Sequence, residues 1–63
     1  MRKFKFTITF KDGTYVDTIA DRWVGRGNWI VFLLVNDQGE VYEEKETLRV
    51  VTSEIRMIER RKP

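Results

Sequence analysis

The residues from Lys3 to Lys11 alternate strictly between polar and apolar side chains, and this pattern constrains the fold more than any other feature. Phenylalanine and isoleucine occupy every even position from Phe4 to Phe10, and lysine or threonine occupies every odd one. A period of two, carried by aromatic and β-branched residues, predicts a β-strand with one buried and one exposed face. The chain therefore begins with a strand of a sheet.

Lys11-Asp12-Gly13 predicts a hairpin turn after this strand, with Gly13 at a positive φ angle. A two-residue turn would place the Asp17 carboxylate on the core face, which is costly. We therefore expect a three-residue turn with a glycine bulge. This turn leaves Ile19 outward, which predicts a second bulge or a strong bend near residues 18–20. The pairs that follow are Phe10 with Thr14, Ile8 with Val16, Phe6 with Thr18, Phe4 with Ala20, Thr7 with Asp17, and Lys3 with Asp21.

The rest of the chain is also read as strands and turns. Trp29–Val35 contains no polar residue, which favours a central strand covered on both faces. The elements expected after it are a turn at residues 36–39, an acidic outer strand at Glu40–Glu46, a short turn or single helical turn at about residues 51–54, and a final strand at Ile55–Glu59. A helix over residues 42–51 is the alternative, because several good helix formers lie there.

Five short strands with tight turns predict an all-β fold: a small five-stranded antiparallel SH3-like or Sm-like barrel, or a strongly curled sheet. The 63 residues are expected to form one domain, 1–63, with residues 60–63 as a flexible basic tail. In an SH3-like barrel the first and last strands pair.

Composition excludes much chemistry. The chain has no cysteine and no histidine, so the usual transition-metal ligands and a thiol nucleophile are absent, and Ser53 has no histidine to activate it. We expect a nonenzymatic protein without catalytic residues, cofactor or metal. The longest apolar run, Trp29–Val35, is far shorter than the roughly 20 residues of a membrane span, and residues after Lys3 alternate unlike a signal peptide. A cytoplasmic protein without membrane contact is expected.

Charge is distributed unevenly along the chain. Residues 1–11 hold four basic side chains and no acid, whereas residues 37–46 hold five acids and one lysine. If the terminal strands pair, a basic surface forms that is suited to phosphate contacts. Its residues would be Arg2, Lys3, Lys5, Arg56, Arg60, Arg61 and Lys62. The alternative is a solvated face neutralised across strands. The acidic strand either protects a sheet edge or faces a partner.

Two tryptophans bracket a glycine–arginine stretch, Trp23 to Trp29. Trp23 and Arg26 could extend the basic surface by stacking on bases and contacting phosphate, and two glycines would allow close backbone approach. Alternatively the stretch is a loop that connects two strands. We expect Trp29 to lie in the core. A cage of Trp23, Trp29, Tyr15 and Tyr42 for a methylated lysine would require these rings to converge.

Two functions fit these features. The first is a nonenzymatic small barrel that binds DNA or RNA with low sequence specificity, through the basic terminal strands, Trp23 and Arg26. The second is a protein-interaction or assembly module, an accessory or inhibitory factor, which uses the Trp23 loop or the acidic strand around Tyr42. A homo-oligomer joined through strand edges is a further option. The sequence leaves both functions open.

Overall fold

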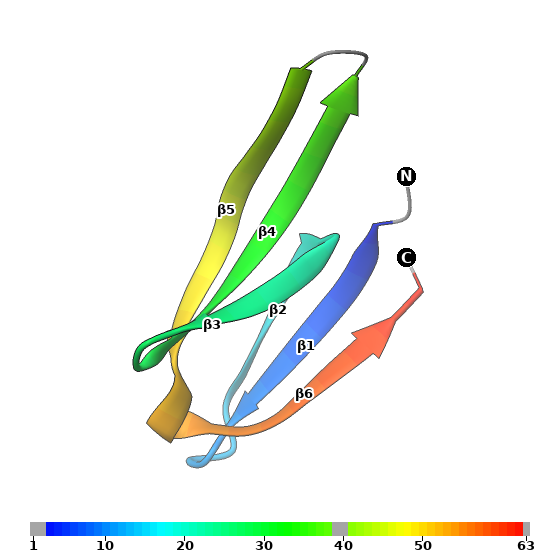
Figure 1. Ribbon diagram of the computed structural model, residues 1–63. Coiled ribbons are helices and arrows are strands. Elements are labelled where there is room, and N and C mark those ends of the chain that lie inside the picture. Colours follow the sequence, from blue (N-terminus) through cyan, green and yellow to red (C-terminus); the bar gives the residue numbers. More distant parts are fainter. Residues whose placement is uncertain (1–2, 39–40, 63) are drawn as a thin grey trace.

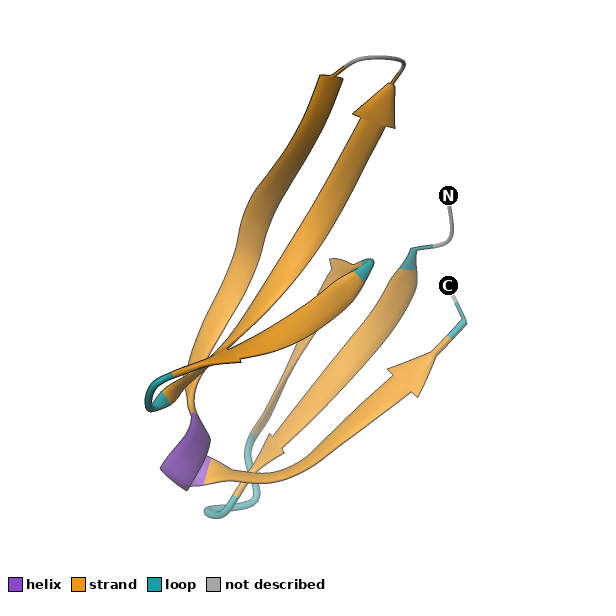
Figure 2. Cartoon of the chain, in the orientation of Figure 1, coloured by secondary structure: helices purple, strands orange, loops and turns teal. Residues whose placement is uncertain are grey.

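The computed structural model describes residues 3–38 and 41–62, with residues 37–38 and 41–42 described by their backbone alone. This part of the chain is all-β apart from one turn of 3-10 helix (Figure 2). The elements are β1 (Phe4–Phe10), β2 (Tyr15–Ala20), β3 (Arg22–Arg26), β4 (Trp29–Gln38), β5 (Val41–Val51), η1 (Thr52–Glu54) and β6 (Ile55–Arg61).

The strands form two antiparallel three-stranded sheets, with the orders β2-β1-β6 and β3-β4-β5 (Figure 1). The pairing of the first strand with the last confirms one sequence prediction. Within the described residues the first sheet ends in β2 and β6 and the second in β3 and β5, and no closed barrel forms. The structure has six strands where we expected five, because the chain bends at Asp21 and passes from the first sheet into the second.

The β1–β2 hairpin has the predicted register: Phe4 lies opposite Ala20 and Thr7 opposite Asp17. Gly13 has a φ of 91°, and its N–H donates to the Phe10 carbonyl at 3.0 Å, as the bulged three-residue turn requires. Ile19 faces outward and is 44% exposed, as expected. Of the two alternatives expected near residues 18–20, the register shows no bulge, and a bend occurs at the adjacent residue 21.

The core lies between the two sheets and uses the apolar face of β1. Phe6, Ile8, Ala20, Phe32 and Val50 are buried together there. The Phe6 and Phe32 ring centroids are 5.2 Å apart with an interplanar angle of 54°. Such aromatic pairs stabilise by about 0.5–1.5 kcal/mol beyond the area they bury. Alternation in β1 thus fixes which side of the first sheet receives the second.

β4 is the central strand of the second sheet, as predicted, although it runs three residues further than expected, to Gln38. Val31, Phe32 and Leu33 are consecutive and are 1%, 0% and 4% exposed, so both faces of the strand are covered there. The β4–β5 hairpin extends beyond the other strands in Figure 1 and contributes to the 43 Å longest dimension.

The C-terminal half resolves the alternatives left by the sequence. Residues 42–51 belong to strand β5, so the helical alternative is wrong. The 3-10 turn at Thr52–Glu54 confirms the predicted helical turn. β6 extends to Arg61, so Arg60 and Arg61 belong to a strand rather than to the expected free tail, and they lie opposite Phe6 and Lys5 of β1.

Candidate functional site

Asp21 fixes the point where the chain crosses from one sheet to the other. Its backbone N–H donates to the Leu33 carbonyl at 2.8 Å, and its Oδ2 accepts the Val35 N–H at 2.6 Å. Its Oδ1 is buried and has no hydrogen-bond partner among the described residues. These bonds tie the start of β3 to β4, and so hold Trp23 in place two residues later. From the sequence Asp21 was expected only as the residue opposite Lys3, so this role was missed.

The stretch from Trp23 to Trp29 is not the loop that the sequence suggested. Gly25 and Arg26 belong to β3, and only Gly27 and Asn28 form the connection. Gly27 has a φ of 59° at the first central position of this two-residue turn, where a type II′ hairpin requires a positive φ. β3 and β4 are therefore a tight hairpin, with Arg26 opposite Trp29.

The two tryptophans lie on opposite faces of the second sheet. Trp23 pairs with Phe32 and so shares the core-facing side, whereas Trp29, an odd number of residues from Phe32, takes the other side. Trp29 is 40% exposed and lies 5.6 Å under the Arg49 guanidinium, so the expectation that it fills the core is wrong. Tyr15 is exposed on the first sheet. Trp23, Trp29 and Tyr15 therefore do not converge on one site, and the Tyr42 side chain lies outside the described part of the chain.

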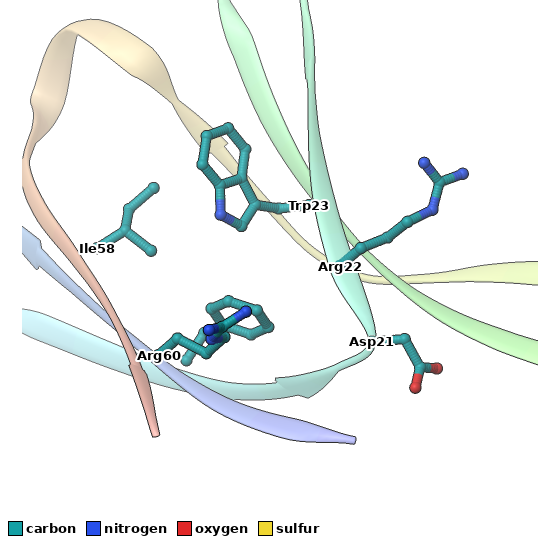
Figure 3. A pocket seen from close by; sticks show the side chains of 6 residues that line it. Asp21, Arg22, Trp23, Ile58 and Arg60 are labelled. Carbon is teal, nitrogen blue, oxygen red and sulfur yellow. The ribbon is translucent and has the colours of Figure 1, made fainter. Parts of the chain in front are cut away.

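A cleft of about 360 Å³ opens between β3 and β6, at the side where the two sheets do not meet. Its lining residues are Phe6, Asp21, Arg22, Trp23, Ile58 and Arg60. Figure 3 shows Trp23, Ile58 and Arg60 directed toward the same space, whereas the side chains of Asp21 and Arg22 point away from it. The volume is at the lower end of the range for ligand pockets. Trp23 is 44% exposed here, which leaves much of its ring available to a partner.

Arg60 supplies the positive charge of the cleft. Its position opposite Phe6 places it on the core-facing side of β6, and its guanidinium lies 4.7 Å from the centre of the Phe4 ring. This cation–π contact, worth about 0.5–1 kcal/mol at an exposed site, holds the side chain over the apolar wall without neutralising its charge. Ile58 and Phe6 were missed as site residues, although the two-residue spacing of Ile58 and Arg60 would have placed them on one face of a strand.

The backbone groups at both rims of the cleft can be assigned from the hydrogen-bond alternation. The Phe10 N–H bonds toward β2, at Thr14, and the Lys11 N–H bonds toward β6, at Glu54. The backbone groups of even-numbered residues of β1 therefore bond to β2, and those of odd-numbered residues bond to β6. Because odd residues of β1 lie opposite odd residues of β6, the backbone groups of Met57, Glu59 and Arg61 are the ones that bond to β1. The N–H and C=O groups of Ile58 and Arg60 then point to the side of β6 that has no neighbouring strand in the described structure.

The same argument applies to β3. Arg26 and Trp29 flank a two-residue turn and form a hydrogen-bonded pair, so residues 22, 24 and 26 bond to β4. The backbone groups of Trp23 and Gly25 consequently point away from β4, toward the unpaired edge. The cleft thus has an apolar wall and the Arg60 cation directed into it, and on each side a strand edge whose backbone groups face no described strand.

The predicted basic surface divides between two faces of the first sheet. Lys5 and Arg61 lie on the outer face, where Lys5 Nζ is 3.7 Å from Asp17 and an Arg61 nitrogen is 3.4 Å from Glu59. Arg60 instead lies in the cleft. The remaining predicted residues that the structure describes are exposed but line no part of the cleft: Lys3, Arg26, Arg56 and Lys62. Arg2 lies outside the described residues.

The acidic strand β5 ends the second sheet, and two of its acidic side chains form ion pairs within the chain. Arg22 forms an ion pair with Glu44, and Arg49 donates to Glu46 at 2.8 Å. Glu43, Glu44 and Glu46 are all exposed on β5. The side chain of Tyr42 lies outside the described part, so its predicted role is not placed.

Comparisons with known proteins give no relative for this chain. No family model matches it, and no curated protein or solved structure is similar to it. No helix in the described ranges is long and apolar enough to cross a membrane. Residues 3–38 and 41–62 also contain no cluster of three or more acidic side chains arranged to hold a metal ion.

Proposed function

We propose that this protein is a nonenzymatic protein-interaction module that binds an extended polypeptide segment in the cleft between β3 and β6. The observation that carries the proposal is the presence of two unpaired strand edges, one on each side of an apolar hollow. A segment that adds to such an edge gains main-chain hydrogen bonds, and its alternate side chains enter the pocket. The chain would then be an open SH3-like barrel, and the guest strand would extend the sheet at the opening.

The cleft is suited to one anchoring side chain of the guest. Trp23 and Ile58 face each other across it, and both present apolar surface that remains partly exposed. Burying further apolar area there contributes about 25 cal/mol per Å². Each backbone hydrogen bond to the edge residues of β6 contributes about 0.5–1.5 kcal/mol net. Together these contributions support a moderate affinity, with the anchor giving specificity and the backbone giving orientation.

Nucleic-acid binding remains the second function, and the geometry favours it less. Two cations of the expected basic surface, Lys5 and Arg61, lie beside carboxylates on the outer face. Phosphate would have to compete with Asp17 and Glu59 there. Trp23 and Arg26, proposed to act together on a base and its phosphate, lie on opposite faces of β3.

The proposal is tested by selecting binders from a library of random peptides displayed on phage. A selected peptide, titrated into ¹⁵N-labelled protein, is expected to shift the amide signals of Trp23, Gly25, Ile58 and Arg60. Ile58→Asp should abolish binding, and Met57→Asp serves as the matched control because Met57 is 46% exposed and faces the other side of β6. Circular dichroism of both variants establishes that they are folded.

Two results would contradict the proposal. The first is that selected peptides shift only signals on the outer face of the first sheet. The second is that no peptide binds, whereas single- or double-stranded oligonucleotides bind at low salt, where phosphate binding is strongest. The nucleic-acid function would then replace this one.

A further inference from the structure

We infer that the segment bound in this cleft is acidic, with a carboxylate two residues away from a large apolar anchor. This inference rests on the function proposed above and specifies the partner's chemistry. Ile58 and Arg60 are two residues apart on the same face of β6, so their Cα atoms are about 7 Å apart along the strand. An added strand has the same side-chain period, and its residues i and i+2 face Ile58 and Arg60.

The charge of the cleft favours a carboxylate at the second of these positions. The Arg60 guanidinium lies over the Phe4 ring and forms no salt bridge with the described residues. Asp21 is the one carboxylate in the described lining, and it points away from the cleft to accept the Val35 N–H. A guest carboxylate opposite Arg60 would therefore meet a cation and no competing acid.

The surrounding residues extend this preference along the strand. Arg56 near the start of β6 and Lys62 just after its end are both exposed, whereas Glu59 faces the opposite side of the sheet, beside Arg61. Although they do not line the cleft, these neighbouring cations raise the rate of encounter with an acidic segment and repel basic ones. The same cations disfavour pairing of β6 with β6 of a second copy, because antiparallel pairing would bring arginines together. The occupant we propose is a different protein with an exposed acidic strand or tail, and a second copy of this chain, whose own β5 is acidic, is one of the outcomes of the test.

The test is a parallel peptide selection against the wild-type protein, Arg60→Glu and Arg61→Glu. Arg61 is the matched control, because it is the next residue of β6 and faces the outer side of the sheet. Wild type and Arg61→Glu should enrich peptides with aspartate or glutamate two residues from a large apolar residue. Arg60→Glu should lose this preference, and should weaken binding of a wild-type-selected acidic peptide about five- to thirtyfold.

Each other outcome separates this inference from the proposed function. Enrichment of neutral or basic peptides that still shift the Ile58 and Arg60 amides would overturn the acidic partner and leave strand addition standing. Equal loss of affinity in Arg60→Glu and Arg61→Glu would also overturn it, by showing a general charge effect. Sedimentation equilibrium that shows a dimer, abolished only by Arg60→Glu, would assign the cleft to a second copy instead. An absence of any cleft-binding peptide would refute the proposed function itself.

Discussion

Replacing Asp21 tests how the two sheets are held together at the site. In Asp21→Ala the Val35 N–H loses a 2.6 Å bond to a carboxylate. Hydrogen bonds to charged groups contribute about 1.5–3 kcal/mol. The Oδ1 atom is buried without a described partner, so its removal relieves some desolvation and favours the lower half of that range. For a domain of 63 residues, whose free energy of unfolding is about 3–9 kcal/mol, the loss is substantial.

The expected shift can be measured directly by thermal and urea unfolding, followed by tryptophan fluorescence and circular dichroism. A loss of about 1.5–2 kcal/mol corresponds to a decrease in Tm of about 6–16 °C for a domain this small. Asp21→Asn keeps a neutral oxygen acceptor and should lose about 1 kcal/mol. Asp17→Ala is the control, because its exposed contacts with Thr7 and Lys5 should contribute under about 1 kcal/mol. Equal midpoints for Asp21→Ala and Asp17→Ala would refute this explanation of the crossover.

Three further predictions concern the core and the first turn. Phe32→Ala removes a fully buried ring and should lower the free energy of unfolding by about 3–5 kcal/mol. Circular dichroism at room temperature should then show much of the protein unfolded, and a loss below about 1 kcal/mol would contradict the central place of Phe32 in the core. Gly13→Ala should lower the free energy of unfolding, measured in urea, by about 1–2 kcal/mol because Gly13 has a φ of 91°. Gly25→Ala should be nearly neutral, because Gly25 has no positive φ and no atom lies near the added Cβ. Equal losses for the two variants would refute this reasoning. The Thr14 hydroxyl, and to a lesser extent the Thr14 N–H, donate to Asp12 and lower the pKa of that carboxyl below 3.8. The resulting contribution to stability is present above pH 3.8 and is lost as the pH falls through the lower pKa of the folded state. In Thr14→Ala an NMR titration should find the Asp12 pKa moved back toward 3.8, and an unchanged pKa would be contrary to expectation.

The first hairpin could be predicted in detail because two independent constraints agreed. The alternation from Lys3 to Lys11 specified the buried face, and the need to keep Asp17 off that face selected the turn. The observed register follows both. The same reasoning could not locate the bend at Asp21, because its cause is a pair of hydrogen bonds to Leu33 and Val35 of a distant strand.

The site was harder to predict because it depends on which strands lack a neighbour. The sequence drew attention to Trp23, and the structure places it in the cleft, yet the residue that faces it there is Ile58, which is remote in sequence and unremarkable in type. The tight turn at Gly27 placed Trp29 on the opposite face from Trp23, and composition alone does not reveal that register. The role of the charged residues was also hard to predict, because the sequence shows that Lys5 is a cation but not that the Asp17 carboxylate lies beside it.

Amide hydrogen exchange along β6 tests the central claim most directly. In the free protein the Ile58 and Arg60 amides point to an edge without a described neighbour and should exchange rapidly, while the Met57 and Glu59 amides bond to β1 and should be protected. Binding of a selected acidic peptide should slow exchange at Ile58 and Arg60 and leave the odd-numbered amides little changed. Rapid exchange at Ile58 and Arg60 in the saturated complex would contradict strand addition in this cleft.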